Sequence, residues 1–151
     1  MKLRILVAMM AVLLLAADAK DDAVAGELQK FAGDWVLAGG EKEGQKLTQE
    51  QIKVGKINWK GRDCVVVTPH QSPDPIKGTL MSIDPTKSPK EMDWIRSTGP
   101  DAGKPFKAIY EFISNDEYRV CFAPPGKDRP KEFKTQPGTG QMMHVWKRSK
   151  K

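Results

Sequence analysis

From Lys56 onward, the chain alternates apolar and polar residues in short runs that are broken by turn-forming residues. In Lys56–Lys60, for example, the pair Ile57 and Trp59 alternates with polar neighbours. Successive side chains of a strand point to opposite faces, so this period of two predicts half-buried strands. Together with a first strand beginning at Gly33–Leu37, the predicted strands are residues 56–60, 64–68, 76–83, 92–97, 107–113, 118–123 and 141–148.

About eight short strands joined in sequence by tight loops, with no βαβ rhythm, indicate an all-β fold. The pattern favours an antiparallel up-and-down barrel, with a β-sandwich as the alternative. Helix is expected only near the start, as short turns at residues 27–31 and 48–54, the second with Thr48 as its N-cap. Gly39–Gly40 and Glu43–Gly44 are expected to end the first strand.

The N-terminus has the layout of a secretory signal peptide. Lys2 and Arg4 precede an apolar run from Ile5 to Ala17, and Ala17-Asp18-Ala19 supplies small residues for cleavage. The run is well short of the roughly 20 residues that a membrane-spanning helix needs, which disfavours the alternative of a permanent anchor. We therefore predict a signal peptide at residues 1–19, a single domain at residues 20–151, and an exported protein, periplasmic or secreted, with no membrane span after processing.

The charge is basic but dispersed. The chain has 25 Lys and Arg against 19 Asp and Glu, a net charge of +6. Acidic residues interrupt the loose cluster of Lys127, Arg129, Lys131 and Lys134. Such a distribution is typical of solvated faces, so we expect no nucleic-acid partner, and weak attraction to an anionic envelope surface is favoured instead.

Few residues are candidates for catalysis or metal binding. The only two histidines are His70, in a proline-rich loop, and His144, in the last predicted strand. Met142-Met143-His144 combines copper-ligand types, but neighbouring strand residues point to opposite faces, so only Met142 and His144 can converge. We expect no catalytic residues, no metal and no cofactor, and therefore a protein that is not an enzyme.

Two cysteines, Cys64 and Cys121, both fall in predicted strands. They form no CxxC motif, which disfavours a redox enzyme. Strand order decides whether they form a disulfide or remain two buried thiols, and both possibilities stay open.

A resemblance to a known family rests on the segment Val120–Pro130, followed by Glu132-Phe133, Pro137-Gly138 and Trp146-Lys147-Arg148. These residues resemble an uncharacterised family of small exported bacterial proteins with a lipocalin-like domain. Gly33-x-Trp35 is similar to the G-x-W that begins the first strand of lipocalins. The resemblance implies that Trp35 closes the barrel base and that Arg148 stacks on it. The chain lacks the lipocalin threonine-aspartate-tyrosine motif, and Ile109-Tyr110-Glu111 stands roughly in its place.

The resemblance and the strand pattern together predict a non-catalytic lipocalin-like domain that holds a small hydrophobic ligand. Candidate cavity residues are the aromatic side chains that alternation turns inward: Trp59, Trp94, Tyr110, Phe112, Tyr118 and Phe122. An eight-stranded barrel is also narrow enough to be filled by its own side chains. The alternative function is an envelope structural or protein-interaction module that binds an envelope protein through its loops, chiefly residues 124–137.

Overall fold

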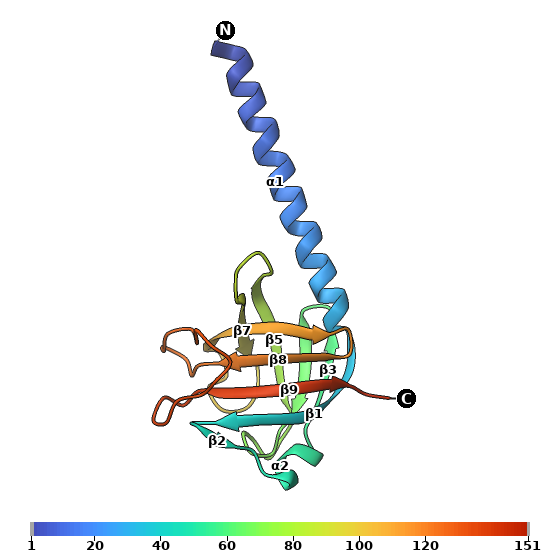
Figure 1. Cartoon of the computed structure of the whole chain (residues 1–151), viewed down its shortest axis with the longest axis vertical. Helices are drawn as coiled ribbons and strands as arrows, with labels where there is room; N and C mark the ends of the chain where they lie inside the picture. The colour runs from blue at the N-terminus through green and yellow to red at the C-terminus, as the bar shows by residue number, and fades with distance from the viewer. Residues whose placement is uncertain (1, 151) are drawn as a thin grey trace.

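A computed structural model describes residues 2–150, with side chains from residue 16 onward. Helix α1 (Lys2–Phe31) is followed by a barrel, and most of α1 projects away from that barrel (Figure 1). In this part of the chain, no helix combines the length and the apolar character that crossing a membrane requires. The remaining elements are β1 (Gly33–Lys42), β2 (Gln45–Lys46), α2 (Gln49–Lys53), β3 (Lys56–Lys60), β4 (Asp63–Val67), β5 (Ile76–Asp84), β6 (Lys90–Arg96), β7 (Pro105–Ser114), β8 (Glu117–Phe122) and β9 (Met142–Arg148).

Eight of the strands close into one antiparallel up-and-down barrel. The order runs from β1 through β3 to β9, and β9 pairs back onto β1 from Trp35↔Arg148 to Lys42↔Met142. The short β2 pairs only with β1. The prediction of an all-β barrel is confirmed, and because one continuous sheet closes on itself, the sandwich alternative is wrong.

Two local predictions differ from the structure. Helix α1 is continuous from Lys2, whereas only a turn at residues 27–31 was expected. Strand β1 also continues through Gly39–Gly40, with a register shift between Leu37 and Gly39. A Cβ at Gly40 would lie 2.5 Å from the Met143 carbonyl oxygen, so glycine here permits close approach of β9 and does not break the strand.

The last turns of α1 cover one end of the barrel, which we call the helix end. Val24, Leu28 and Phe31 recur at the spacing of one helix face and pack against the core. After the helix, Gly33 leads directly into β1. Its φ of +109° is a backbone conformation that residues other than glycine rarely adopt. At the opposite end, which we call the distal end, lie the connections at residues 68–75, 97–104 and 123–141.

Helix α2 begins as the sequence predicts. The Thr48 side chain accepts a hydrogen bond from the Gln51 backbone N–H, and the Gln51 side chain accepts one from the Thr48 N–H. This reciprocal capping box satisfies two backbone donors that the helix itself leaves without partners.

The segment 123–141 lies against the outer face of β6, β7 and β8. The Arg129 guanidinium donates to the carbonyls of Met92 and Ala108 and pairs with Asp93 at 2.7 Å. Arg119 on β8 lies 4.1 Å from the Phe133 ring. As a result, the outward-pointing residue Cys121 is buried although it lies outside the barrel.

Candidate functional site

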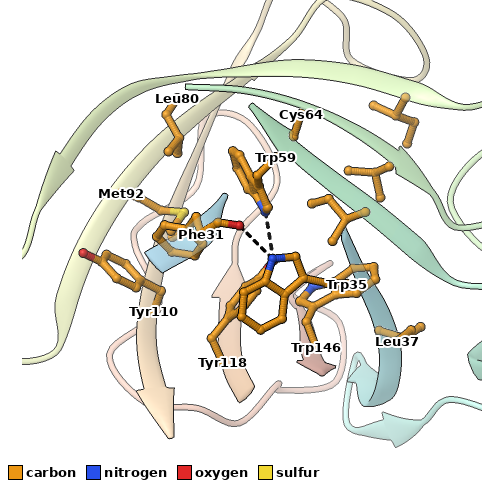
Figure 2. Close-up of a cluster of buried hydrophobic side chains, with 14 of the residues drawn as sticks. Phe31, Trp35, Leu37, Trp59, Cys64, Leu80, Met92, Tyr110, Tyr118 and Trp146 are labelled. Atoms are coloured by element: carbon orange, nitrogen blue, oxygen red, sulfur yellow. Dashed lines mark hydrogen bonds between the residues drawn. The ribbon is translucent and has the colours of Figure 1, made fainter. Parts of the chain in front are cut away.

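The helix end is filled by an aromatic cluster. The Phe31 ring lies 5.4 Å from Trp59, 5.3 Å from Tyr110, 4.7 Å from Phe112 and 5.0 Å from Tyr118, centroid to centroid. Figure 2 shows Phe31 among Trp59, Tyr110 and Tyr118, with Trp35 and Trp146 beside them. The Trp59 indole N–H donates to the Tyr118 hydroxyl at 3.0 Å. Phe31 therefore closes this end of the barrel.

Trp35 and Arg148 meet at the same end. Trp35 is 1% exposed, its indole N–H donates to the Phe31 carbonyl at 2.7 Å, and the Arg148 guanidinium carbon lies 4.1 Å from its ring. Arg148 also donates to the carbonyls of Lys30 and Ala32, just ahead of Gly33. This is the arrangement that the lipocalin resemblance implied for Gly33, Trp35 and Arg148.

A buried carboxylate completes the helix end. Glu27 is 4% exposed, and it accepts hydrogen bonds from the Tyr110 hydroxyl at 2.9 Å and from Lys90 and Lys30 at 2.9 and 3.0 Å. Burial raises its pKa, but these hydrogen bonds outweigh burial and hold the pKa of the carboxyl below its ordinary value. The charge is thus fully compensated where it lies.

Between this cluster and the distal end, the barrel encloses a cavity of about 60 Å³. Its lining is almost entirely apolar. The residues are Ile57, Trp59, Cys64, Val66, Gln71, Ile76, Met92, Trp94, Phe106, Ala108, Tyr118, Val120, Phe122, His144 and Trp146. Of the six predicted cavity aromatics, Trp59, Trp94, Tyr118 and Phe122 line it. Tyr110 and Phe112 do not, because they pack around Phe31.

The size of the cavity limits what it can hold. Protein interiors are close-packed, and voids larger than a water molecule are few. One water needs roughly 10–15 Å³ of space that a water-sized probe occupies, so the cavity has room for a short alkyl chain. Sites for drug-sized ligands are several times larger, at roughly 300–1,000 Å³. The barrel is therefore neither filled by its own side chains nor wide enough for a large ligand.

A pair of histidines lies at the distal end of the cavity. His70, from the β4–β5 loop, and His144, on β9, approach to 3.1 Å between their Nε2 atoms. Burial, with His70 and Arg96 nearby, lowers the pKa of His144 to about 3, and burial and Lys42 lower that of His70. Both rings are therefore neutral at pH 7, and one must donate to the other. The sequence does not predict this pair, because the two histidines lie 74 positions apart and no local pattern relates them.

Arg96 lies beside the histidine pair and was missed at the sequence level. It is 5% exposed, and its guanidinium carbon lies 4.3 Å from the Phe106 ring and 5.4 Å from the Trp94 ring. Its terminal nitrogens donate to the Gln71 side-chain oxygen at 2.6 Å and to the Pro100 carbonyl at 3.0 Å. The available signal was its position: with Met92 and Trp94, Arg96 continues the inward-facing series of its strand.

The Arg96 charge has no counter-ion in the part of the chain that is described. Asp101 acts on it electrostatically, but that carboxylate forms its ion pair with Lys104. Burial lowers the pKa of the Arg96 guanidinium, which nevertheless stays protonated at any physiological pH. Its Nε–H has no hydrogen-bond acceptor within residues 2–150. A buried cation without a paired carboxylate is costly, because buried charges are normally paired.

Of the two possibilities left open for the cysteines, the structure shows two buried thiols, because Cys64 and Cys121 are both free. Cys64 lines the cavity, whereas Cys121 points outward and lies under the segment 123–141, so the barrel wall separates the two thiols. Their strands, β4 and β8, are not neighbours. Burial raises the pKa of each thiol to about 12, which keeps both protonated.

Among residues 2–150, no three His, Cys, Asp or Glu side chains gather closely enough to hold a metal ion. The side chains at the distal end can form hydrogen bonds and present a positive charge to a molecule in the cavity. Comparison with known proteins yields no match to this chain, whether with protein-family models, curated proteins or solved structures.

Proposed function

We propose that this chain is an exported, non-catalytic, lipocalin-like domain that binds a small apolar ligand inside its barrel. The observation that carries this proposal is the cavity of about 60 Å³, bounded by aromatic and aliphatic side chains from nearly every strand. A void of this kind is a cost in a close-packed interior, since its lining loses contacts that a ligand would restore.

The driving force is contact with apolar surface. Each Å² of apolar surface removed from water contributes about 25 cal/mol, so a ligand of a few carbon atoms gains modest affinity from burial alone. The cavity therefore favours short alkyl chains or a small ring. Export belongs to the same proposal, and Lys2, Arg4 and the apolar run to Ala17 support it. Membership in the family with lipocalin-like domains belongs to it as well, and the contact of Arg148 with Trp35 supports this membership.

The alternative is an interaction module that binds an envelope protein through residues 124–137. It has less support, because much of that segment contacts the barrel itself. Arg129 and Phe133 pack against the outer face of the strands, and Thr135 hydrogen-bonds Glu41 on β1. These side chains stabilise the barrel and are not free for a partner.

The test is titration with neutral short-chain alcohols such as 1-hexanol, followed by tryptophan emission, because Trp59, Trp94 and Trp146 all line the cavity. We expect saturable binding by the wild type. Ala108→Leu adds a side chain inside the cavity and should abolish binding, whereas Ala38→Leu makes the same change at an exposed position of β1 and should not. A folded wild type that no compound with a short alkyl chain saturates would remove the ligand proposal and favour the interaction module.

A further inference from the structure

The distal end of the cavity differs chemically from the rest of its lining. Aliphatic and aromatic groups surround the deep part, toward Trp59 and Tyr118. The polar side chains Gln71 and His144 occur only at the distal end, with His70 and Arg96 directly behind them. A molecule in the cavity therefore meets apolar walls along its length and hydrogen-bonding groups at one end.

Within residues 2–150, two buried N–H donors at this end of the cavity lack a strong hydrogen-bond acceptor. Arg96 Nε–H has no partner within the described residues, and the guanidinium has no paired carboxylate. The buried indole N–H of Trp94 has no nitrogen or oxygen acceptor, and the neighbouring Cys64 thiol is only a weak one. Removing the Arg96 guanidinium from water on folding costs free energy, and no paired carboxylate in the described part of the chain offsets this cost. An anion bound there would offset it.

Building on the proposed function, we infer that the ligand is a short aliphatic monocarboxylate, with its alkyl chain in the cavity and its carboxylate on Arg96. The Nε–H and one Nη2–H of a guanidinium form a fork that matches the two oxygens of a carboxylate. In the present structure the Gln71 side-chain oxygen accepts from that Nη2 at 2.6 Å, the position of one carboxylate oxygen. The Gln71 side-chain oxygen thus occupies the position of one ligand oxygen. Gln71 is a partly exposed loop residue whose amide nitrogen donates to the Thr68 hydroxyl at 2.9 Å, and ligand binding requires this side chain to turn away.

The neutral state of the histidine pair suits this assignment. With both imidazoles uncharged, Arg96 beside His144 and Lys42 near His70 make this end of the cavity positive. Asp101, the carboxylate that acts electrostatically on Arg96 within residues 2–150, is exposed and paired with Lys104, so it does not compete strongly for the guanidinium. A cationic ligand is disfavoured by Arg96, and a neutral one leaves its charge uncompensated.

The experiment compares hexanoate, 1-hexanol and acetate by tryptophan emission and by isothermal titration. We expect hexanoate to bind about 10-fold or more tightly than 1-hexanol, because a hydrogen bond to a charged group contributes more than a neutral one. Acetate, which lacks the alkyl chain, should bind far more weakly than hexanoate. Gln71→Ala frees the position of one carboxylate oxygen on Arg96, so it should increase the preference for hexanoate over 1-hexanol.

Two Arg96 variants and one control make the result specific. Arg96→Gln should lose the preference for hexanoate while its affinity for 1-hexanol stays that of the wild type. Arg96→Lys keeps the charge without the planar fork and should retain only part of the preference. Arg62→Gln removes an exposed arginine near the helix end and should change neither affinity.

The outcomes separate this inference from the proposed function. If 1-hexanol saturates the wild type but hexanoate binds no more tightly, the apolar cavity site stands and the carboxylate assignment is wrong. If the preference for hexanoate persists in both Arg96 variants, the anion binds elsewhere and the assignment is again wrong. If acetate binds as tightly as hexanoate, the cavity plays no part in the site. If neither six-carbon compound saturates the wild type, the proposed function itself fails.

Discussion

The two ends of the barrel differ in whether their buried polar side chains have hydrogen-bond partners. At the helix end, Glu27 has three donors, and the indoles of Trp35 and Trp59 each have an acceptor. At the distal end lie all three buried side-chain atoms that lack a hydrogen-bond partner within the described residues: His70 Nδ1, Trp94 Nε1 and Arg96 Nε. Within the described residues, the chain thus satisfies the buried polar side chains named at the helix end and leaves three buried side-chain atoms unsatisfied at the distal end.

The contrast separates stability from binding. A satisfied buried network rigidifies the fold, whereas each unsatisfied buried group costs free energy and calls for an explanation. The cavity lies toward the unsatisfied end, which is where a ligand would find both space and hydrogen-bonding groups. Places where a protein departs from good packing and pairing are expected at functional sites.

The largest expected effect comes from replacing a tryptophan at each end. Trp35→Ala removes a side chain that packs on Tyr118 and Arg148 and that is hydrogen-bonded to Phe31, so it should lower the free energy of unfolding by about 3–5 kcal/mol. Trp94→Ala removes a half-buried side chain that already borders a void, and it should cost less, about 1–3 kcal/mol. Denaturant unfolding of the two variants measures both.

Equal costs for the two tryptophans would mean that the distal end contributes as much packing as the helix end. A Trp94→Ala variant that loses ligand binding while keeping most of its stability would show that the distal end serves binding more than stability.

The next effect is a pH dependence that differs between the ends. The pKa of His144 is about 3 in the folded protein and about 6.5 in the unfolded chain, so only the unfolded chain takes up a proton at pH 5. The stability that the neutral imidazole contributes is complete above pH 6.5 and is lost as the pH falls toward 3. This amounts to about 2 kcal/mol at pH 5, and His70, whose pKa is also lowered, acts in the same direction.

His144→Gln should therefore reduce the loss of stability between pH 7 and pH 5. Glu27→Gln is the matched change at the helix end. The Glu27 pKa is lowered below its ordinary value, so the stability from this carboxylate is lost only as the pH falls below about 4.5. Denaturation midpoints at pH 7, 5 and 3 distinguish the two. If the Glu27 variant changes the slope between pH 7 and 5 and the His144 variant does not, the roles of the two ends are reversed.

The strand pattern could be predicted from the sequence because it depends on local rules. Alternation of residues such as Ile57 and Trp59 gives strands, and prolines and glycines give the connections. The inward direction of Trp59, Trp94, Tyr118 and Phe122 follows from the same period of two. The same reasoning failed at Gly39–Gly40. The sequence does not distinguish a glycine that lets a neighbouring strand approach closely from one that ends a strand.

The polar end of the cavity could not be predicted, since it depends on distances across the barrel. His70 and His144 meet only because the β4–β5 loop folds over the distal end of β9. Cys64 and Cys121 fall on opposite sides of the barrel wall, which a sequence does not reveal before the strand order is known. For Arg96, position on the inward face of β6 was a usable signal, but the missing counter-ion is a property of the whole fold.

The smallest expected effect concerns Arg148, whose guanidinium lies over Trp35 at the rim of the helix end. It donates to the Lys30, Ala32 and Asn115 carbonyls and to Asp116, and a third of its side chain is exposed. Because solvent weakens these contacts, Arg148→Ala should cost about 1–2 kcal/mol, less than Trp35→Ala. Lys147→Ala, at the neighbouring exposed position of β9, should stay within about 0.5 kcal/mol of the wild type. Urea denaturation of both variants provides the measurement. Ligand affinity should not change in either variant, because Arg148 lies at the opposite end from Arg96; a loss of affinity in Arg148→Ala would show that the two ends are coupled.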